Sequence, residues 1–130
     1  TMLGLARRDA VWRGFKVPRY RFGTITVWPN RTRDTFYNTC SNADAEAAAA
    51  RLCPEPVPPL LQPIAKQEDR TPPRAFIETT EDRTLSIDLQ RFMHRRFDMK
   101  KVATLKTDHS PFYSAPAELS EKIAEIAADF

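Results

Sequence analysis

Residues 74–130 alternate between strand-like and helix-like segments, and this alternation limits the possible folds more than any other feature of the sequence. Short apolar runs with β-branched residues cover residues 74–80 and 101–107. A helical pattern lies between them, and a last amphipathic helix begins at Pro116. This order predicts two parallel strands joined by a right-handed crossover. We therefore expect an α/β fold in this region.

The two helices of this region are predicted from their caps and their apolar spacing. Ser86 is a good N-cap for the first of them. Its large apolar side chains recur at helical spacing and predict one buried stripe of Leu89, Phe92, Met93 and Phe97. Leu119, Ile123 and Ile126 are spaced in the same way in the last helix. His94 lies among arginines, so we expect it on the surface.

The N-terminal residues 1–40 are basic and aromatic, and the only clear element in them is a strand at 23–28 that ends at Pro29. The chain has a net charge of +3, and its basic residues concentrate before position 34. A basic surface with aromatic side chains is what a nucleic-acid interface needs. No recognised nucleic-acid-binding pattern follows, however. We therefore expect a solvated segment and no nucleic-acid partner.

An alanine-rich helix is predicted for residues 41–53, with Ser41 as its N-cap. Cys40 and Cys53 flank this helix. At a rise of about 1.5 Å per residue they would lie about 20 Å apart, too far for a disulfide. Neither cysteine is close in sequence to a histidine, so no metal site is expected. We expect two free thiols in a reducing cytoplasm, with no cofactor.

Proline and glycine divide the chain unevenly. Seven of the eleven prolines lie between Pro54 and Pro73, which indicates either a polyproline ligand or, as we favour, a stiff connector. We place the boundary of the two parts here, at 1–63 and 64–130. The three glycines all precede residue 24. This excludes a Gly-rich phosphate loop, a dinucleotide fingerprint and a G-x-S-x-G turn from the sequence. No apolar run is long enough to span a bilayer, so we expect no membrane partner.

Two titratable residues follow the two predicted strands. Asp82 comes shortly after the first strand, and His109 shortly after the second. Because the carboxyl ends of parallel strands meet at one edge of a sheet, we expect the two side chains to lie close together. A carboxylate that accepts from one imidazole nitrogen leaves the other nitrogen free to act as a general base. The pattern therefore predicts two members of an acid–base–nucleophile relay.

Several motifs resemble the α/β-hydrolase superfamily. Four segments are similar to the C-terminal end of its methylesterase, pyrethroid-hydrolase and hydroxynitrile-lyase branch: residues 76–83 (FIETTEDR), 89–93 (LQRFM), 108–112 (DHSPF) and 116–119 (PAEL). Residues 36–41 (FYNTCS) and the alanine-rich helix, through 51–56, are similar to a cap-domain helix of that branch. The resemblance implies the C-terminal portion of an α/β-hydrolase fold. It makes residues 1–63 a mainly helical cap segment with a proline-rich exit, and residues 64–130 part of the core.

The resemblance also implies roles for single residues. Asp82 matches the acid of the family's catalytic triad, and His109 matches its base. Ser110 stands where the cyanohydrin-cleaving members carry a lysine, which favours ester hydrolysis over lyase chemistry. Asp108 is expected to be a structural turn residue. Four apolar residues either line a substrate pocket or form the cap core: Phe36, Tyr37, Leu60 and Leu61.

The nucleophile of such a triad is absent from the sequence. Its five serines, at positions 41, 86, 110, 114 and 120, all lack the flanking glycines of the nucleophile turn. We therefore expect part of a carboxylic-ester hydrolase that acts on a small-molecule ester, and predict that the chain alone is inactive. Its expected partner is the Ser-bearing N-terminal half or a second copy of the chain. The alternative is a non-enzymatic, possibly dimeric binding protein derived from a hydrolase tail.

Overall fold

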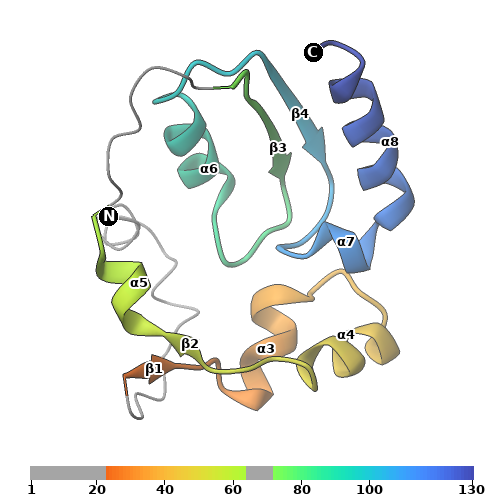
Figure 1. Cartoon of the computed structure of the whole chain (residues 1–130). Coiled ribbons are helices and arrows are strands. Elements are labelled where there is room, and N and C mark those ends of the chain that lie inside the picture. Colours follow the sequence, from red (N-terminus) through yellow and green to blue (C-terminus); the bar gives the residue numbers. More distant parts are fainter. Residues whose placement is uncertain (1–22, 64–71) are drawn as a thin grey trace.

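The computed structural model describes residues 23–63 and 72–130 (Figure 1). The expectations for most of the basic N-terminal residues therefore lie outside the described residues. In chain order, the elements are β1 (Thr24–Ile25), α3 (Pro29–Phe36), α4 (Asn42–Ala49), β2 (Glu55–Pro56), α5 (Val57–Leu61), β3 (Ala75–Thr79), α6 (Ile87–His94), β4 (Lys101–Leu105), α7 (Pro111–Ser114) and α8 (Pro116–Ala127). Within the described ranges, no helix is both long and apolar enough to cross a membrane.

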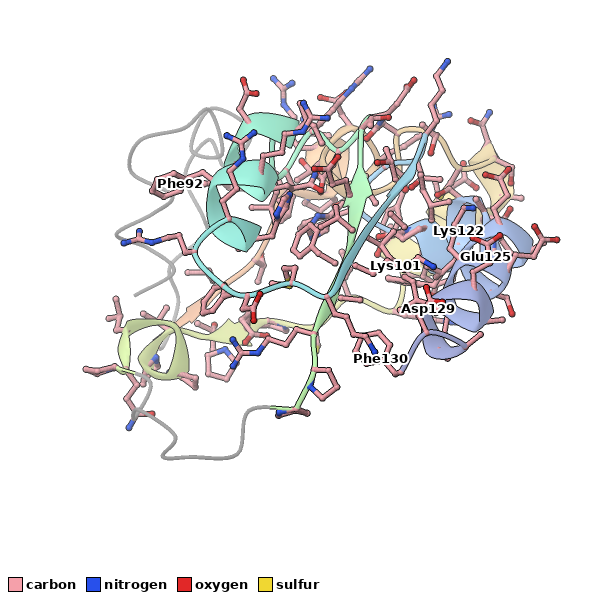
Figure 2. The ribbon with its side chains drawn as sticks, turned by 90° about the horizontal axis from the view of Figure 1, so that it is seen from above. Phe92, Lys101, Lys122, Glu125, Asp129 and Phe130 are labelled. Carbon is pink, nitrogen blue, oxygen red and sulfur yellow. The ribbon has the colours of Figure 1, made fainter. Side chains whose placement is uncertain are left out.

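Strands β3 and β4 pair in parallel, as the alternation predicts. Ala75 lies opposite Lys101 and Thr79 lies opposite Leu105, so all five residues of each strand are paired. Helix α6 makes the crossover between them, and α6 and α8 lie on opposite sides of the strand pair (Figures 1 and 2). The loops after β3 and β4 therefore leave from the same end of the sheet.

Helix α6 starts at the predicted cap, but only part of its predicted apolar stripe is buried. The Ser86 hydroxyl accepts from the Leu89 N–H at 3.3 Å, and the helix ends at His94, three residues before Phe97. Its buried residues are Leu89 and Gln90. The expected apolar stripe is therefore wrong at Phe92 and Phe97, which are exposed. The early end of the helix removes Phe97 from the helical register.

Cationic side chains cover both exposed rings. The guanidinium of Arg96 lies 5.1 Å from the centroid of Phe92, and that of Arg74 lies 5.2 Å from the centroid of Phe97. Figure 2 shows the Phe92 ring directed away from the strands. Cation–π contact gives an aromatic ring a favourable neighbour at the surface without a place in the core.

Helix α8 is held against β4 by charged side chains at its C-terminal end. Lys101 forms an ion pair with Asp129 and donates to the backbone carbonyl of Glu125 at 3.4 Å. Lys122 pairs with Glu125 at 2.8 Å, and Figure 2 shows these four side chains together. Ile123, predicted in the apolar stripe, is exposed.

The segment before the prolines contains a helix that the sequence analysis missed. The predicted strand at 23–28 shortens to β1, and α3 follows where irregular structure was expected. Pro29, predicted to end the strand, is the first residue of this helix, where its missing N–H costs nothing. Thr32 and Thr35 are buried and donate their hydroxyls to the carbonyls one turn back, at 3.1 and 2.7 Å.

Helix α4 forms behind its predicted cap, and it packs against α3. The Ser41 hydroxyl accepts from the Asp44 N–H at 3.1 Å, but the helix ends at Ala49 instead of residue 53. A small core of Tyr37, Cys40, Ala45 and Ala48 forms beside it. Both cysteines are free thiols, Cys40 buried and Cys53 exposed.

The described part of the proline-rich connector has regular structure of its own. Residues of β2 pair antiparallel with β1, with Thr24 opposite Pro56. The short helix α5 follows directly. The start of the connector is therefore paired with the strand that precedes α3.

Candidate active site

Asp82 lies in the loop that follows β3, and its side chain is 3% exposed. The loop continues the strand pairing by one step, because the Glu81 N–H donates to the carbonyl of Thr107 at 2.9 Å. One carboxylate oxygen of Asp82 accepts from the N–H groups of Thr84 and Leu85, at 2.7 and 2.9 Å. These bonds hold the carboxylate in place through Oδ1, and the other oxygen, Oδ2, points away from these two N–H groups.

That second oxygen meets the imidazole of His109. His109 Nδ1 and Asp82 Oδ2 lie 2.9 Å apart, as expected from the two strand ends. The His109 side chain is 33% exposed, so the rest of its ring faces the surface. With the proton on Nδ1 directed at the carboxylate, Nε2 is the nitrogen that can accept a proton. Such a pair has the geometry in which a carboxylate can orient a general base.

The ring of Phe36, at the end of α3, contacts this histidine. The two ring centroids are 5.4 Å apart. Phe36 also lines an open cavity of about 940 Å³ between β1, α3 and the end of α4. Most of the lining is apolar and includes Ile25, Trp28, Ala49 and Leu52. The imidazole and the cavity therefore share one aromatic neighbour.

The other residues expected in a substrate pocket lie elsewhere. Tyr37 is buried in the small α3–α4 core, edge-on to Tyr113 at 5.8 Å between centroids, and its burial raises the pKa of its hydroxyl. Leu61 is exposed at the end of α5 and does not line the cavity. The side chain of Leu60 lies outside the described residues. The structure thus brings together Asp82, His109 and Phe36.

Comparisons with known proteins find methylesterases and a pyrethroid hydrolase among the relatives of this chain. No family model matches the chain. It is 30% identical over 95 residues to putative methylesterase 14, chloroplastic, of Arabidopsis thaliana, covering 71% of this chain and 27% of that protein. It is 39% identical over 56 residues to the pyrethroid hydrolase of Sphingobium wenxiniae, covering 42% of this chain and 20% of that enzyme.

The fold comparison agrees with the sequence comparison. The crystal structure of polyneuridine aldehyde esterase superposes with a TM-score of 0.72 at 22% identity, covering 80% of this chain and 43% of that one. The chain is a homologue of the α/β-hydrolase methylesterases. The matched region makes up only about a quarter of the length of putative methylesterase 14. The resemblance expected from the sequence motifs is therefore confirmed, for part of the fold.

In this methylesterase homologue, the loop of Asp82, residues 80–86 (the acid loop), is also bonded to residues 29–49 (the α3–α4 segment). The Thr84 hydroxyl donates to the carbonyl of Thr35 at 2.6 Å. The side-chain amide of Asn38 donates to the carbonyl of Glu81 at 3.1 Å. The α3–α4 segment and the acid loop therefore form one hydrogen-bonded unit.

Asp108, the residue before the histidine, is fully buried. Its Oδ1 accepts from the Ser110 N–H at 3.0 Å, the expected turn, and from the Ser114 hydroxyl at 2.9 Å. Its Oδ2 accepts from the Thr39 N–H at 2.9 Å and from the Cys40 thiol at 3.5 Å. Burial by itself raises the pKa of Asp108, but the hydrogen bonds from Thr39, Ser110 and Ser114 outweigh it, and the pKa lies below its usual value.

Gln90 is a second supporting residue, which the sequence analysis missed. Its side chain bonds both backbone groups of Thr79: the amide donates to the carbonyl and the Oε1 accepts from the N–H, each at 2.9 Å. The amide also donates to the carbonyl of Leu85 at 2.8 Å. Gln90 thereby joins both ends of the loop that holds Asp82. One sequence signal could have indicated this role: Gln90 is a polar residue that directly follows the buried Leu89 in a capped helix.

Glu78, on β3, forms a separate buried cluster with α6. Arg91 donates to both of its carboxylate oxygens, at 3.1 and 3.3 Å, and Thr104 donates to one at 3.3 Å. His94 Nε2 lies 3.0 Å from Glu78 Oε1, and its side chain is only 11% exposed, so the expected surface position is wrong. The Arg91 hydrogen bonds, with smaller contributions from His94 and Thr104, hold the pKa of Glu78 below its usual value despite its burial.

No group of three metal-ligating side chains occurs among residues 23–63 and 72–130.

Proposed function

We propose that this chain is the acid- and base-bearing part of a carboxylic-ester hydrolase with a Ser-His-Asp triad. The observation that carries the proposal is the 2.9 Å contact between His109 Nδ1 and Asp82 Oδ2. Homology to methylesterases supports the ester-hydrolase class. Because no serine of the chain has the flanking glycines of a nucleophile turn, we assign the nucleophile to a segment outside these residues.

The proposed roles follow from the proton each group can hold. His109 Nε2 takes the proton of the serine hydroxyl while the serine oxygen attacks the ester carbonyl carbon. The tetrahedral intermediate expels the alcohol, which takes that proton from His109. A water molecule then attacks the acyl carbon while His109 takes its proton. The bond to the serine oxygen breaks, the serine takes that proton back from His109, and the free acid leaves. Asp82 stabilises the imidazolium in both steps and stays ionised.

The cavity indicates the kind of ester. Its lining is mostly apolar, and Phe36 places one wall of it beside the imidazole. An apolar acyl or alcohol group gains about 25 cal/mol for each Å² of apolar surface that it buries. We therefore propose a small-molecule ester with a bulky apolar group. Ser110, in place of a lysine, supports hydrolysis over cyanohydrin cleavage.

A chimera tests the proposed triad. In the chimera, this chain replaces the matching region of the pyrethroid hydrolase. The remaining part of that enzyme then supplies the segment to which we assign the nucleophile. The chimera is expected to hydrolyse a p-nitrophenyl ester, and His109→Ala is expected to lower kcat by at least about a thousandfold. Asp82→Asn is expected to lower it as well, by fixing the wrong tautomer.

The matched control is His94→Ala, which removes the other described histidine. It is expected to leave kcat near the value of the unsubstituted chimera. A folded chimera with no turnover, or one as active with alanine at position 109, contradicts the proposal. The 130-residue chain alone is expected to show no turnover.

The exposed apolar side chains support a protein partner. Val102, Phe112 and Ile123, on β4, α7 and α8, are each exposed. We infer that another part of a hydrolase fold, or a second copy of the chain, covers them. Analytical ultracentrifugation of the chain distinguishes these, because only the second copy gives a dimer of the chain alone.

A further inference from the structure

The buried carboxylate of Asp108 has no part in the proton transfers proposed above. Its two oxygens face two different segments of the chain. Oδ2 faces the junction between α3 and α4, at Thr39 and Cys40. Oδ1 faces the turn that carries the base, at Ser110 and Ser114. One side chain therefore satisfies donors from both segments.

Two further contacts join the same segments. The Asp108 N–H donates to the Thr39 hydroxyl at 3.2 Å, so backbone and side chain of Asp108 both bond this residue. Phe36, at the end of α3, lies with its ring 5.4 Å from that of His109. Because His109 directly follows Asp108 in the chain, whatever fixes Asp108 also fixes the backbone from which the imidazole projects.

We propose that Asp108 is a positioning residue that couples the α3–α4 junction to the base, holding His109 where its Nδ1 meets Asp82. The proposal rests on the roles proposed for Asp82 and His109. A carboxylate suits this position because it accepts hydrogen bonds on two oxygens and donates none. An asparagine offers one oxygen, so it satisfies one segment and presents an N–H₂ group to donors of the other.

The test reads the histidine directly and needs no ester substrate. In the full ¹⁵N-labelled chain, at a pH where the imidazole is neutral, long-range ¹H–¹⁵N correlations of the His109 ring report which nitrogen carries the proton. The chain is expected to show the Nδ1–H tautomer, with cross-relaxation between the rings of Phe36 and His109. Asp82→Asn is expected to replace this tautomer with the Nε2–H form.

Asp108→Ala is expected to give mixed tautomers and to abolish the Phe36–His109 cross-peaks. Asp108→Asn is expected to weaken both signals. Thr39→Val removes the side-chain hydroxyl that accepts from the Asp108 N–H and keeps the Thr39 N–H that donates to Oδ2, and it is expected to lower the cross-peak intensity in a folded chain. Because Thr39→Val removes no charge, it still tests whether these contacts position His109 when Asp108→Ala does not fold.

Glu78→Gln is the matched control, because it also removes a buried carboxylate but one that holds α6 instead of the base. It is expected to leave the tautomer and the cross-peaks unchanged. The proposal is overturned if Asp108→Asn and Thr39→Val leave both signals at their original values. A separate result, a tautomer that does not respond to Asp82→Asn, overturns the proposed triad instead. The two failures are therefore distinguishable.

Discussion

Two buried carboxylates, Glu78 and Asp108, are stabilised in opposite ways. Glu78 meets a cation, a histidine and a hydroxyl within the β3–α6–β4 unit that contains it. Asp108 is bonded by N–H, O–H and S–H groups from two segments, and its closest partner across the fold is 69 residues away in sequence. Both carboxyl groups have a pKa below the usual value. A guanidinium stabilises one unit locally, whereas neutral donors let a carboxylate join two units.

The largest difference is expected when each carboxylate is removed. Asp108→Ala leaves several buried donors without an acceptor, and each such group costs about 1–3 kcal/mol. We expect the free energy of unfolding to fall by about 3 kcal/mol or more. Urea denaturation monitored by far-UV circular dichroism measures it. A loss well below 1 kcal/mol would show that water replaces the carboxylate and that the two segments are not joined there.

Glu78→Gln is expected to have a smaller effect. The Arg91 side chain is 44% exposed, so its guanidinium can return to water when the charge of Glu78 is lost. Hydrogen bonds to a charged group contribute about 1.5–3 kcal/mol, and part of this is recovered through solvation. We expect a loss of about 1–2 kcal/mol in the same measurement. A loss equal to that of Asp108→Ala would abolish the distinction between the two sites.

The two carboxylates can also be compared through the pH dependence of the free energy of unfolding. Because both folded-state pKa values are lowered, the stability they contribute is present above their ordinary values, 3.8 for Asp108 and 4.5 for Glu78. That stability is lost as the pH falls from there through the folded-state pKa. Between about pH 5 and pH 2, Asp108→Asn is expected to flatten the decline in unfolding free energy. If the unfolding free energy of the variant declines as steeply with falling pH as that of the unsubstituted chain, Asp108 does not have a lowered pKa in the folded state.

The smallest effect is expected at the surface. Arg83 forms an ion pair with Asp34 between the acid loop and α3, and both side chains are well exposed. Exposed ion pairs contribute about 0–1 kcal/mol. Arg83→Ala is therefore expected to change the free energy of unfolding by less than about 0.5 kcal/mol. A larger change would show that charge, as well as the buried hydrogen bonds, attaches the α3–α4 segment to the acid loop.

The sequence predicted the elements whose pattern is local. The alternating segments predicted β3 and β4. Ser41 and Ser86 predicted the starts of α4 and α6, because each serine hydroxyl accepts a hydrogen bond from the N–H only three residues later. The proximity of Asp82 and His109 followed from parallel strands alone. Helix α3 was missed because its residues are mostly polar, so no apolar period reveals it.

The supporting residues of the site could not be predicted in this way. Gln90 and His94 are polar residues on a helix, and only the position of β3 decides that they face inward. Asp108 was expected in a local turn, and that bond is present. Its bonds to Thr39 and Cys40 depend on the docking of a distant segment, which no local pattern encodes.

The long separation between Asp108 and Thr39 also bears on how the chain folds. Bringing together residues 69 positions apart closes a large loop, and the entropy lost in doing so rises with the logarithm of loop length. The proline-rich residues 54–63 and 72–73 lie inside this loop. Each proline restricts the unfolded chain, so fewer conformations are lost on closure. If the connector is as stiff as its prolines predict, it lowers the entropic barrier to forming the contact between Asp108 and Thr39.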